Sequence, residues 1–155
     1  MRIIALDVGT KRIGLAFADT AVRIAIPRGM IPVDGNEMAE IAKQFRLEKA
    51  DLIVSGLPRN NSGEATRQTE AVQAFIAALI DYFSANEQFT PEVFFQDESY
   101  TSVEAEEHLR GASRQDRADG KVDSEAATLI LQDFLERSDL HDIESKLSTK
   151  ETHEN

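Results

Sequence analysis

The spacing of apolar residues changes along this chain, and this change limits the possible folds more than any other feature. Residues 2–8, 13–18 and 22–31 have the short apolar or alternating patterns of strands, and a turn joins the first two as a hairpin. Helical spacing then appears at 37–47, before a buried strand at 51–58. The first part of the chain therefore predicts three consecutive strands, followed by a helix and a fourth strand.

The second half continues to alternate. The spacing between Val72 and Phe83 predicts a strong helix, and Asn61 with Glu64 would cap its start. Apolar residues on consecutive positions at 92–96 predict a strand that is covered on both faces.

Two further helices complete the predicted order. Thr101 and Glu104 fit a capping box for a helix that a polar loop separates from a last helix, which begins at Asp123. Beyond about Ser138 the chain is polar and aperiodic, which predicts a frayed or disordered tail.

Together these elements predict an α/β fold. Three strands in a meander, followed by strands that alternate with helices, give a mixed sheet with helices on both faces. Pro27 predicts a bulge or an edge position in the third strand. In such folds the carboxyl ends of the strands are the expected place for a functional site.

Composition narrows the classes of function. With 17 basic and 28 acidic residues the net charge is −11, which counts against nucleic-acid binding unless the cations are concentrated. Several cations do gather in predicted loops, among them Lys11, Arg12, Arg59 and Lys121. No apolar run approaches the ~20 residues of a membrane span, and no secretory signal is visible, so a cytoplasmic protein without a membrane partner is expected.

Three carboxylates stand where the chain enters or leaves the predicted core. Asp7 interrupts an apolar strand, Asp97 and Glu98 end another, and Asp123 opens the last helix. If they converge, mutual repulsion raises their pKa values, and a divalent cation removes that conflict. The chain has no cysteine, and oxygen ligation suits Mg²⁺ or Mn²⁺.

Each of these residues also has a simpler interpretation. Asp123 would serve as a helix N-cap, Glu98 as a surface acid at a strand end, and Asp7 as a turn residue before Gly9. The residues alone leave these alternatives open.

Two loops could contact phosphate. Gly9 and Gly14 flank Lys11 and Arg12, where small residues let a backbone approach closely, although a plain hairpin turn has the same pattern. The stretch GLPRNNSG at 56–63 leads toward a helix N-terminus, which suits either a phosphate site containing Arg59 or an ordinary capped connection.

Four blocks carry a family resemblance. The stretches LDVGTKRIGLAFAD, VSGLPRNNSGEAT, FQDESYTSVEAEEHL and GKVDSEAATLILQDFL together resemble the YqgF family in order and spacing. Its members are known as pre-16S rRNA nucleases and as Holliday-junction-resolvase-like proteins. The resemblance implies a ribonuclease H-like fold with a five-stranded mixed sheet over about residues 1–137, leaving 138–155 as an acidic flexible tail.

The resemblance also implies a site. The family's catalytic and metal-binding carboxylates fall on Asp7, Glu98 and Asp123, with Mg²⁺ or Mn²⁺ as the cofactor. Substrate phosphates would be held by loop residues, namely Lys11, Arg12, Arg59, Asn60 and Lys121. The family usually has arginine after the glutamate, whereas this chain has Ser99.

The expected function is therefore a metal-dependent nuclease for structured RNA, most simply at the 5′ end of pre-16S rRNA. Three alternatives stay open: a resolvase of branched DNA acting as a homodimer rather than a monomer, a non-catalytic nucleic-acid or ribosome-assembly factor favoured by Ser99 and the net charge of −11, and a phosphate-binding ATPase-like domain suggested by D-x-G-T.

Overall fold

A five-stranded mixed sheet forms the centre of the computed structural model, which describes residues 1–60, 62–97 and 121–153 without the side chains of 121–123 and 151–153. The strand order is β3-β2-β1-β4-β5. The first three strands pair antiparallel, whereas β4 pairs parallel with β1 and β5, as predicted. The strands are β1 (Arg2–Val8), β2 (Arg12–Asp19), β3 (Ile26–Pro32), β4 (Leu52–Leu57) and β5 (Glu92–Asp97).

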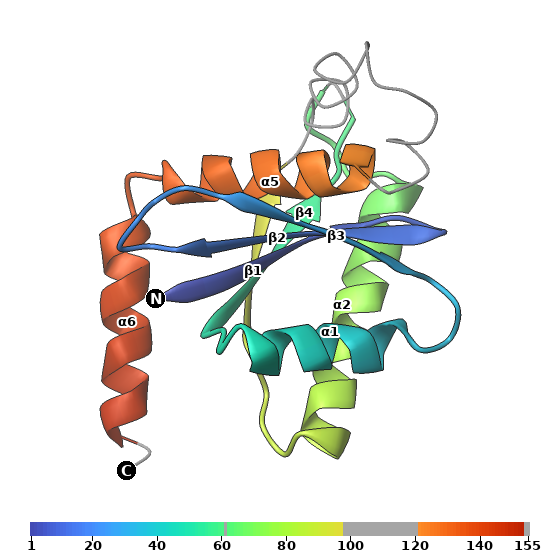
Figure 1. The fold of residues 1–155 in the computed structure, drawn as a ribbon. Coiled ribbons are helices and arrows are strands. Elements are labelled where there is room, and N and C mark those ends of the chain that lie inside the picture. The colour runs from blue at the N-terminus through green and yellow to red at the C-terminus, as the bar shows by residue number, and fades with distance from the viewer. Residues whose placement is uncertain (61, 98–120, 154–155) are drawn as a thin grey trace.

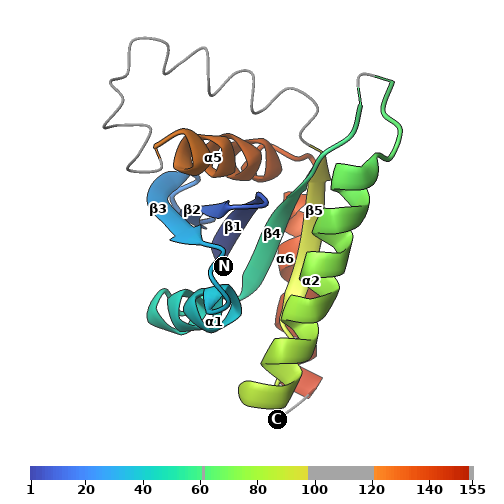
Figure 2. The same cartoon turned by 90° about the vertical axis from the view of Figure 1, so that its right-hand side faces the viewer.

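Helices cover both faces of this sheet (Figure 1). One face carries α1 and α2, and the opposite face carries α5, with α6 packing against the same core as α5 (Figure 2). None of the helices in the described part of the chain is both long and apolar enough to cross a membrane. The helices are α1 (Glu37–Leu47), α2 (Arg67–Asn86), α5 (Lys121–Leu135) and α6 (Leu140–His153).

Strand alternation divides the apolar residues into two cores. In β1, Ile4, Leu6 and Val8 belong to the core under α1 and α2. Ile3 and Ala5 belong to the core under α5 and α6. Because successive side chains point to opposite faces, β1, the middle strand of the sheet, contributes to both cores.

The edge strand β3 contains the bulge that Pro27 predicts. Pro27 pairs with Ala16 and Met30 with Gly14, so Arg28 and Gly29 together oppose Leu15. Gly29 has a φ of 78°, a conformation that glycine adopts without a steric penalty. Because of the bulge, the Gly29 N–H is not part of the regular pairing between β2 and β3. It instead makes a hydrogen bond in the candidate site described below.

The predicted cap of α2 is wrong. Glu64, one half of that cap, lies in a turn before the helix, where its backbone N–H and that of Ser62 donate to the side-chain oxygen of Asn60. The helix is instead capped by Thr66, whose side chain accepts from the Thr69 N–H while the Thr69 hydroxyl accepts from the Thr66 N–H. Asn61, the other half of the predicted cap, lies outside the described residues.

The prediction that the strand at 92–96 is covered on both faces is also wrong. β5 is the last strand of the sheet, and Phe95 is 36% exposed. Val93 and Phe94 are only partly buried against the two cores. A run of consecutive apolar residues cannot distinguish a central strand from an edge strand, because the neighbours in the sheet come from elsewhere in the chain.

The predicted flexible tail is replaced by a helix. Residues 140–153 form α6, in which Leu140 and Ile143 are buried and Leu147 is partly buried in the core under α5. The apolar face predicted for the helix beginning near Asp123 is confirmed in α5, although this helix is not the last. The capping box at Thr101 and the following helix lie outside the described residues.

Candidate active site

Asp7 lies on the α5 face of the sheet, near the carboxyl end of β1. It has the same parity as Ile3 and Ala5, yet it is only partly buried whereas those two residues are fully buried. Its partner on β2 is Gly14, which carries no side chain. The apolar core on this face therefore stops at Asp7, where the strand presents a carboxylate beside a glycine.

The start of α5 is attached to the strands next to Asp7. Ser124 is 4% exposed, and its hydroxyl donates to the Leu15 carbonyl at 3.2 Å. The same oxygen accepts from the Gly29 N–H at 3.2 Å, so the bulge in β3 supplies the second contact. Leu15 directly follows Gly14, the partner of Asp7.

This attachment has a consequence for two predicted site residues. Lys121 and Asp123 belong to the first turn of α5, immediately before Ser124. The backbone of that turn is thus held beside β2, the neighbour of the strand that carries Asp7. The side chains of Lys121 and Asp123 lie outside the described residues. Sequence reasoning missed Ser124, although a serine directly before the apolar stripe of α5 is a usable signal of a buried polar contact.

Asp97 is separated from Asp7, as strand alternation predicts. It has the parity of Val93, which packs against the core under α1 and α2. Its carboxylate accepts a hydrogen bond from Arg59 Nε at 2.9 Å and is 65% exposed. Glu98, the predicted site residue that follows it, lies outside the described residues.

The turn between β1 and β2 brings backbone groups very close together. The Gly9 N–H donates to the Arg12 carbonyl at 3.0 Å, and a Cβ on Gly9 would lie 2.5 Å from that oxygen. Only glycine fits this approach without a shift of the backbone. The turn leaves Lys11 and Arg12 exposed, which suits contact with phosphate groups.

The loop after β4 contains the other two predicted phosphate contacts. Asn60 is exposed but uses its side-chain oxygen to close the turn described above. Arg59 reaches Asp97 and also donates to the Gly63 carbonyl at 3.5 Å. Both residues therefore have a structural role in this loop, which leads from β4 to α2 and contacts the end of β5 through Asp97.

One polar side chain on the Asp7 face was not predicted. The Oε1 atom of Gln96 is buried and has no hydrogen-bond partner among the residues that the structure describes. Gln96 shares the parity of Phe94, which packs under α5. The signal in the sequence was an amide that follows three apolar residues within a predicted strand.

The residues present fit a divalent cation that prefers oxygen ligands. Asp7 contributes a carboxylate, and Gln96 has a buried amide oxygen without a donor. Of the predicted triad, only Asp7 has a described side chain. No group of three acidic or histidine residues that could hold a metal ion occurs among the described residues.

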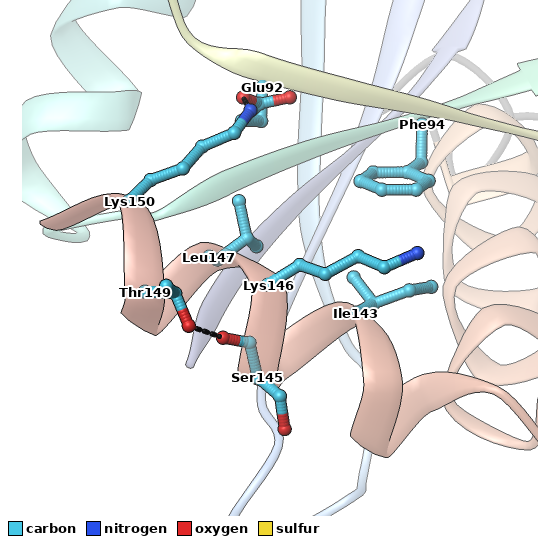
Figure 3. Close-up of a pocket in the computed structure, with 8 residues that line it drawn as sticks. All are labelled: Glu92, Phe94, Ile143, Ser145, Lys146, Leu147, Thr149 and Lys150. Atoms are coloured by element: carbon cyan, nitrogen blue, oxygen red, sulfur yellow. Dashed lines mark hydrogen bonds and ion pairs between the residues drawn. The ribbon is translucent and has the colours of Figure 1, made fainter. Parts of the chain in front are cut away.

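A cavity of about 770 Å³ lies elsewhere, between α6 and β5 (Figure 3). Its floor is apolar, with Phe94, Ile143 and Leu147, while Lys146 and Lys150 stand at its rim. Lys150 forms an ion pair with Glu92, the first residue of β5. The cavity thus lies at the amino end of β5. Asp7 lies near the carboxyl end of β1, and β1, β4 and β5 run parallel, so the cavity and Asp7 are at opposite ends of these strands.

Comparison with known proteins identifies relatives over most of the chain. The pattern of the family described as "RuvX: Holliday junction resolvase" matches residues 1–137. A Salinibacter ruber protein named "Putative pre-16S rRNA nuclease" is 38% identical over 141 residues, 88% of this chain and 94% of that protein. A Nitratidesulfovibrio vulgaris protein of the same name is 35% identical over 138 residues, 87% of this chain and 93% of that protein.

A solved structure supports the fold. The Holliday junction resolvase of fowlpox virus aligns with a TM-score of 0.52 at 14% identity, covering 88% of this chain and 99% of that protein. The mixed sheet with helices on both faces is thus a ribonuclease H-like fold. Within this class, the chain belongs to the RuvX family, also known as YqgF, as its four sequence blocks predicted.

Proposed function

We propose that this protein is a metal-dependent nuclease that hydrolyses phosphodiester bonds in structured RNA, with the 5′ end of pre-16S rRNA as its target. The names of its relatives support the RNA substrate. The observation that carries the proposal is the position of Asp7. Its carboxylate follows two buried apolar residues on the α5 face of β1, where the hydrophobic core ends. A carboxylate at the carboxyl end of a central strand is a suitable oxygen ligand for a divalent cation, and such a cation supports hydrolysis.

Three carboxylates form the proposed ligand set. Asp7, Glu98 and Asp123 would hold Mg²⁺ or Mn²⁺, with Glu98 and Asp123 assigned from the family resemblance alone. The bound cation supplies activation of water and stabilisation of the departing oxygen. The attachment of α5 through Ser124 keeps the first turn of that helix beside β2, which supports the placement of Asp123 in this set.

Exposed cations would hold the phosphates of the substrate. Lys11 and Arg12 are supported by their exposure in a rigid turn next to Asp7. Because the net charge is −11, local cations are needed to attract an anionic substrate at all. The proposed contacts are Lys11, Arg12, Arg59, Asn60 and Lys121.

The test uses labelled pre-16S rRNA with Mn²⁺ or Mg²⁺. Wild-type protein should cleave it, and Asp7→Asn should lower the rate by about 100- to 1,000-fold, because a metal supplies several kcal/mol of transition-state stabilisation. Asp81→Asn is a matched control on the exposed side of α2 and should cleave like wild type. Undiminished cleavage by the Asp7 variant would reject the assignment.

A four-way DNA junction is the second candidate substrate. The description of the family favours it. Symmetric cleavage of two strands requires a dimer, so light scattering on the same preparation discriminates the two activities. A monomer that cuts RNA but leaves junctions intact supports the RNA substrate. RNA binding without cleavage in either metal would instead support a non-catalytic factor, to which Ser99 and the net charge also point.

A further inference from the structure

Asp7 and Gln96 lie in one row across the sheet, on the face covered by α5. Gln96 pairs with Gly56 of β4. Asp7 is one residue beyond Leu6, which pairs with Ser55, so the parallel register continues from Asp7 to Gly56. The same parity holds in all three strands, because Ala5, Val54 and Phe94 form the preceding row in the core under α5.

Glycine separates the two polar residues of this row. Gly56 has no side chain, so the sheet itself places nothing between the side chains of Asp7 and Gln96. Two strand spacings put the Cα atoms of these residues about 10 Å apart. Both side chains leave the same face, and an aspartate and a glutamine together are long enough to approach one ligand from opposite sides.

The state of the Gln96 amide indicates what kind of ligand fits. Its Oε1 atom is buried, and no hydrogen-bond donor from the described part of the chain reaches it. A buried acceptor without a donor is costly, so such atoms in folded proteins usually have a function or an additional partner. Amide oxygens are regular ligands of hard divalent cations, and they add no charge to a site already rich in carboxylates.

We propose that Gln96 supplies a neutral oxygen to the divalent cation that Asp7 holds, across the gap left by Gly56. This inference rests on the proposed metal-dependent function and extends its site to a residue outside the carboxylate triad. It explains why an amide follows Phe94, a residue of the core under α5, on the same face of the strand.

The test measures Mn²⁺ binding to the full chain without nucleic acid, by the electron paramagnetic resonance signal of free Mn²⁺. Gln96→Met keeps the side-chain volume but removes the oxygen, and the Kd should rise about tenfold. Gln96→Glu keeps an oxygen and adds a charge, so its Kd should equal the wild-type value or fall below it. The control Gln73→Met, on an exposed position of α2, should bind like wild type.

The two Gln96 variants separate metal binding from a merely structural role. A structural role gives Gln96→Met the wild-type Kd, or makes Gln96→Glu bind more weakly than wild type, and either result overturns the inference. Thermal melts verify that each variant is folded. If Gln96→Met does not fold, the direction in which the Kd for Mn²⁺ changes in Gln96→Glu decides the test alone.

The proposed function has its own readout in the same titration. Loss of Mn²⁺ binding in Asp7→Asn together with a wild-type Kd in Gln96→Met rejects only the role of Gln96. A wild-type protein that binds no Mn²⁺ at millimolar concentration rejects the metal-dependent function, and the role of Gln96 with it.

Discussion

The two faces of β1 differ although they belong to one strand. On the face under α1 and α2, Ile4, Leu6 and Val8 are all buried, so the apolar core extends to the end of the strand. On the face under α5, Ile3 and Ala5 are buried, but Asp7 is only partly buried. The protein uses one face of the strand for stability and keeps the end of the other face for a polar site.

The neighbouring strand repeats this difference. In β4, Ile53 and Leu57 join the core under α1 and α2, whereas Gly56 stands on the α5 face. At the ends of β1 and β4 the α5 face therefore has Asp7 and Gly56, where the other face has the aliphatic residues Val8 and Leu57. A site thus begins where one core ends, without disturbing the core on the reverse side of the same strands.

Substitutions at adjacent residues should separate stability from activity most clearly. Leu6 is fully buried, and Leu6→Ala should lower the free energy of unfolding by about 3 kcal/mol, because it removes apolar contacts and leaves a cavity. Urea denaturation measures this change. Asp7→Asn, one residue further, should stay within about 1 kcal/mol of wild type while cleavage is lost. Equal losses of stability in both variants would contradict the division between the two faces.

Ser124→Ala tests how the α5 face is assembled. The substitution leaves the Gly29 N–H and the Leu15 carbonyl without this partner, which should lower the free energy of unfolding by about 1–3 kcal/mol. Cleavage should also fall under conditions where the variant is fully folded, because the first turn of α5 loses its attachment. Ser145→Ala is the control, since this exposed serine bonds only within α6, and it should change stability by less than about 0.5 kcal/mol. A variant as stable and active as wild type would show that the contact is dispensable.

The smallest expected effect concerns the connection between α5 and α6. This connection lies where the sequence predicted the start of a flexible tail. Arg137 donates two hydrogen bonds to Asp139, at 2.8 and 2.9 Å, and these lower the pKa of the Asp139 carboxyl. A lowered folded-state pKa stabilises the fold above the ordinary aspartate pKa of about 3.9, and the gain is lost as pH falls through the folded-state value.

Melting temperatures of wild type and Asp139→Asn measure this contribution. The wild type should be slightly more stable near pH 6, and the two curves should converge as the pH falls below the ordinary aspartate pKa of about 3.9. A difference that is independent of pH would show that the ion pair is not its source.

Several features of the candidate site were visible in the sequence because they depend on local patterns. A carboxylate inside an apolar strand marks Asp7 whatever its neighbours are, and the alternation of side chains separates Asp97 from the Asp7 face. Gly9 was recognisable in the same way, since a tight turn between two strands needs a residue that permits close backbone approach. The assignment of Glu98 came instead from the family resemblance and stays a prediction.

Other features could not be obtained from local patterns. The apolar stripe of Leu140, Ile143 and Leu147 is embedded in polar sequence, and it forms a docked helix only because β1, β4 and β5 together present a surface to bury it. The start of α2 depended on the turn around Asn60. Both outcomes result from competition between weak local signals, which contacts with distant segments decide.

The sequence by itself determined the order of the five strands, the family and the unusual carboxylate in β1, because each is a property of consecutive residues. Only the tertiary structure decided that Gly14, Asp7, Gly56 and Gln96 share one row under α5. The physical reason is strand register: a shift of one residue would turn every side chain of a strand to the other face, and the packing of both cores selects the register that is observed.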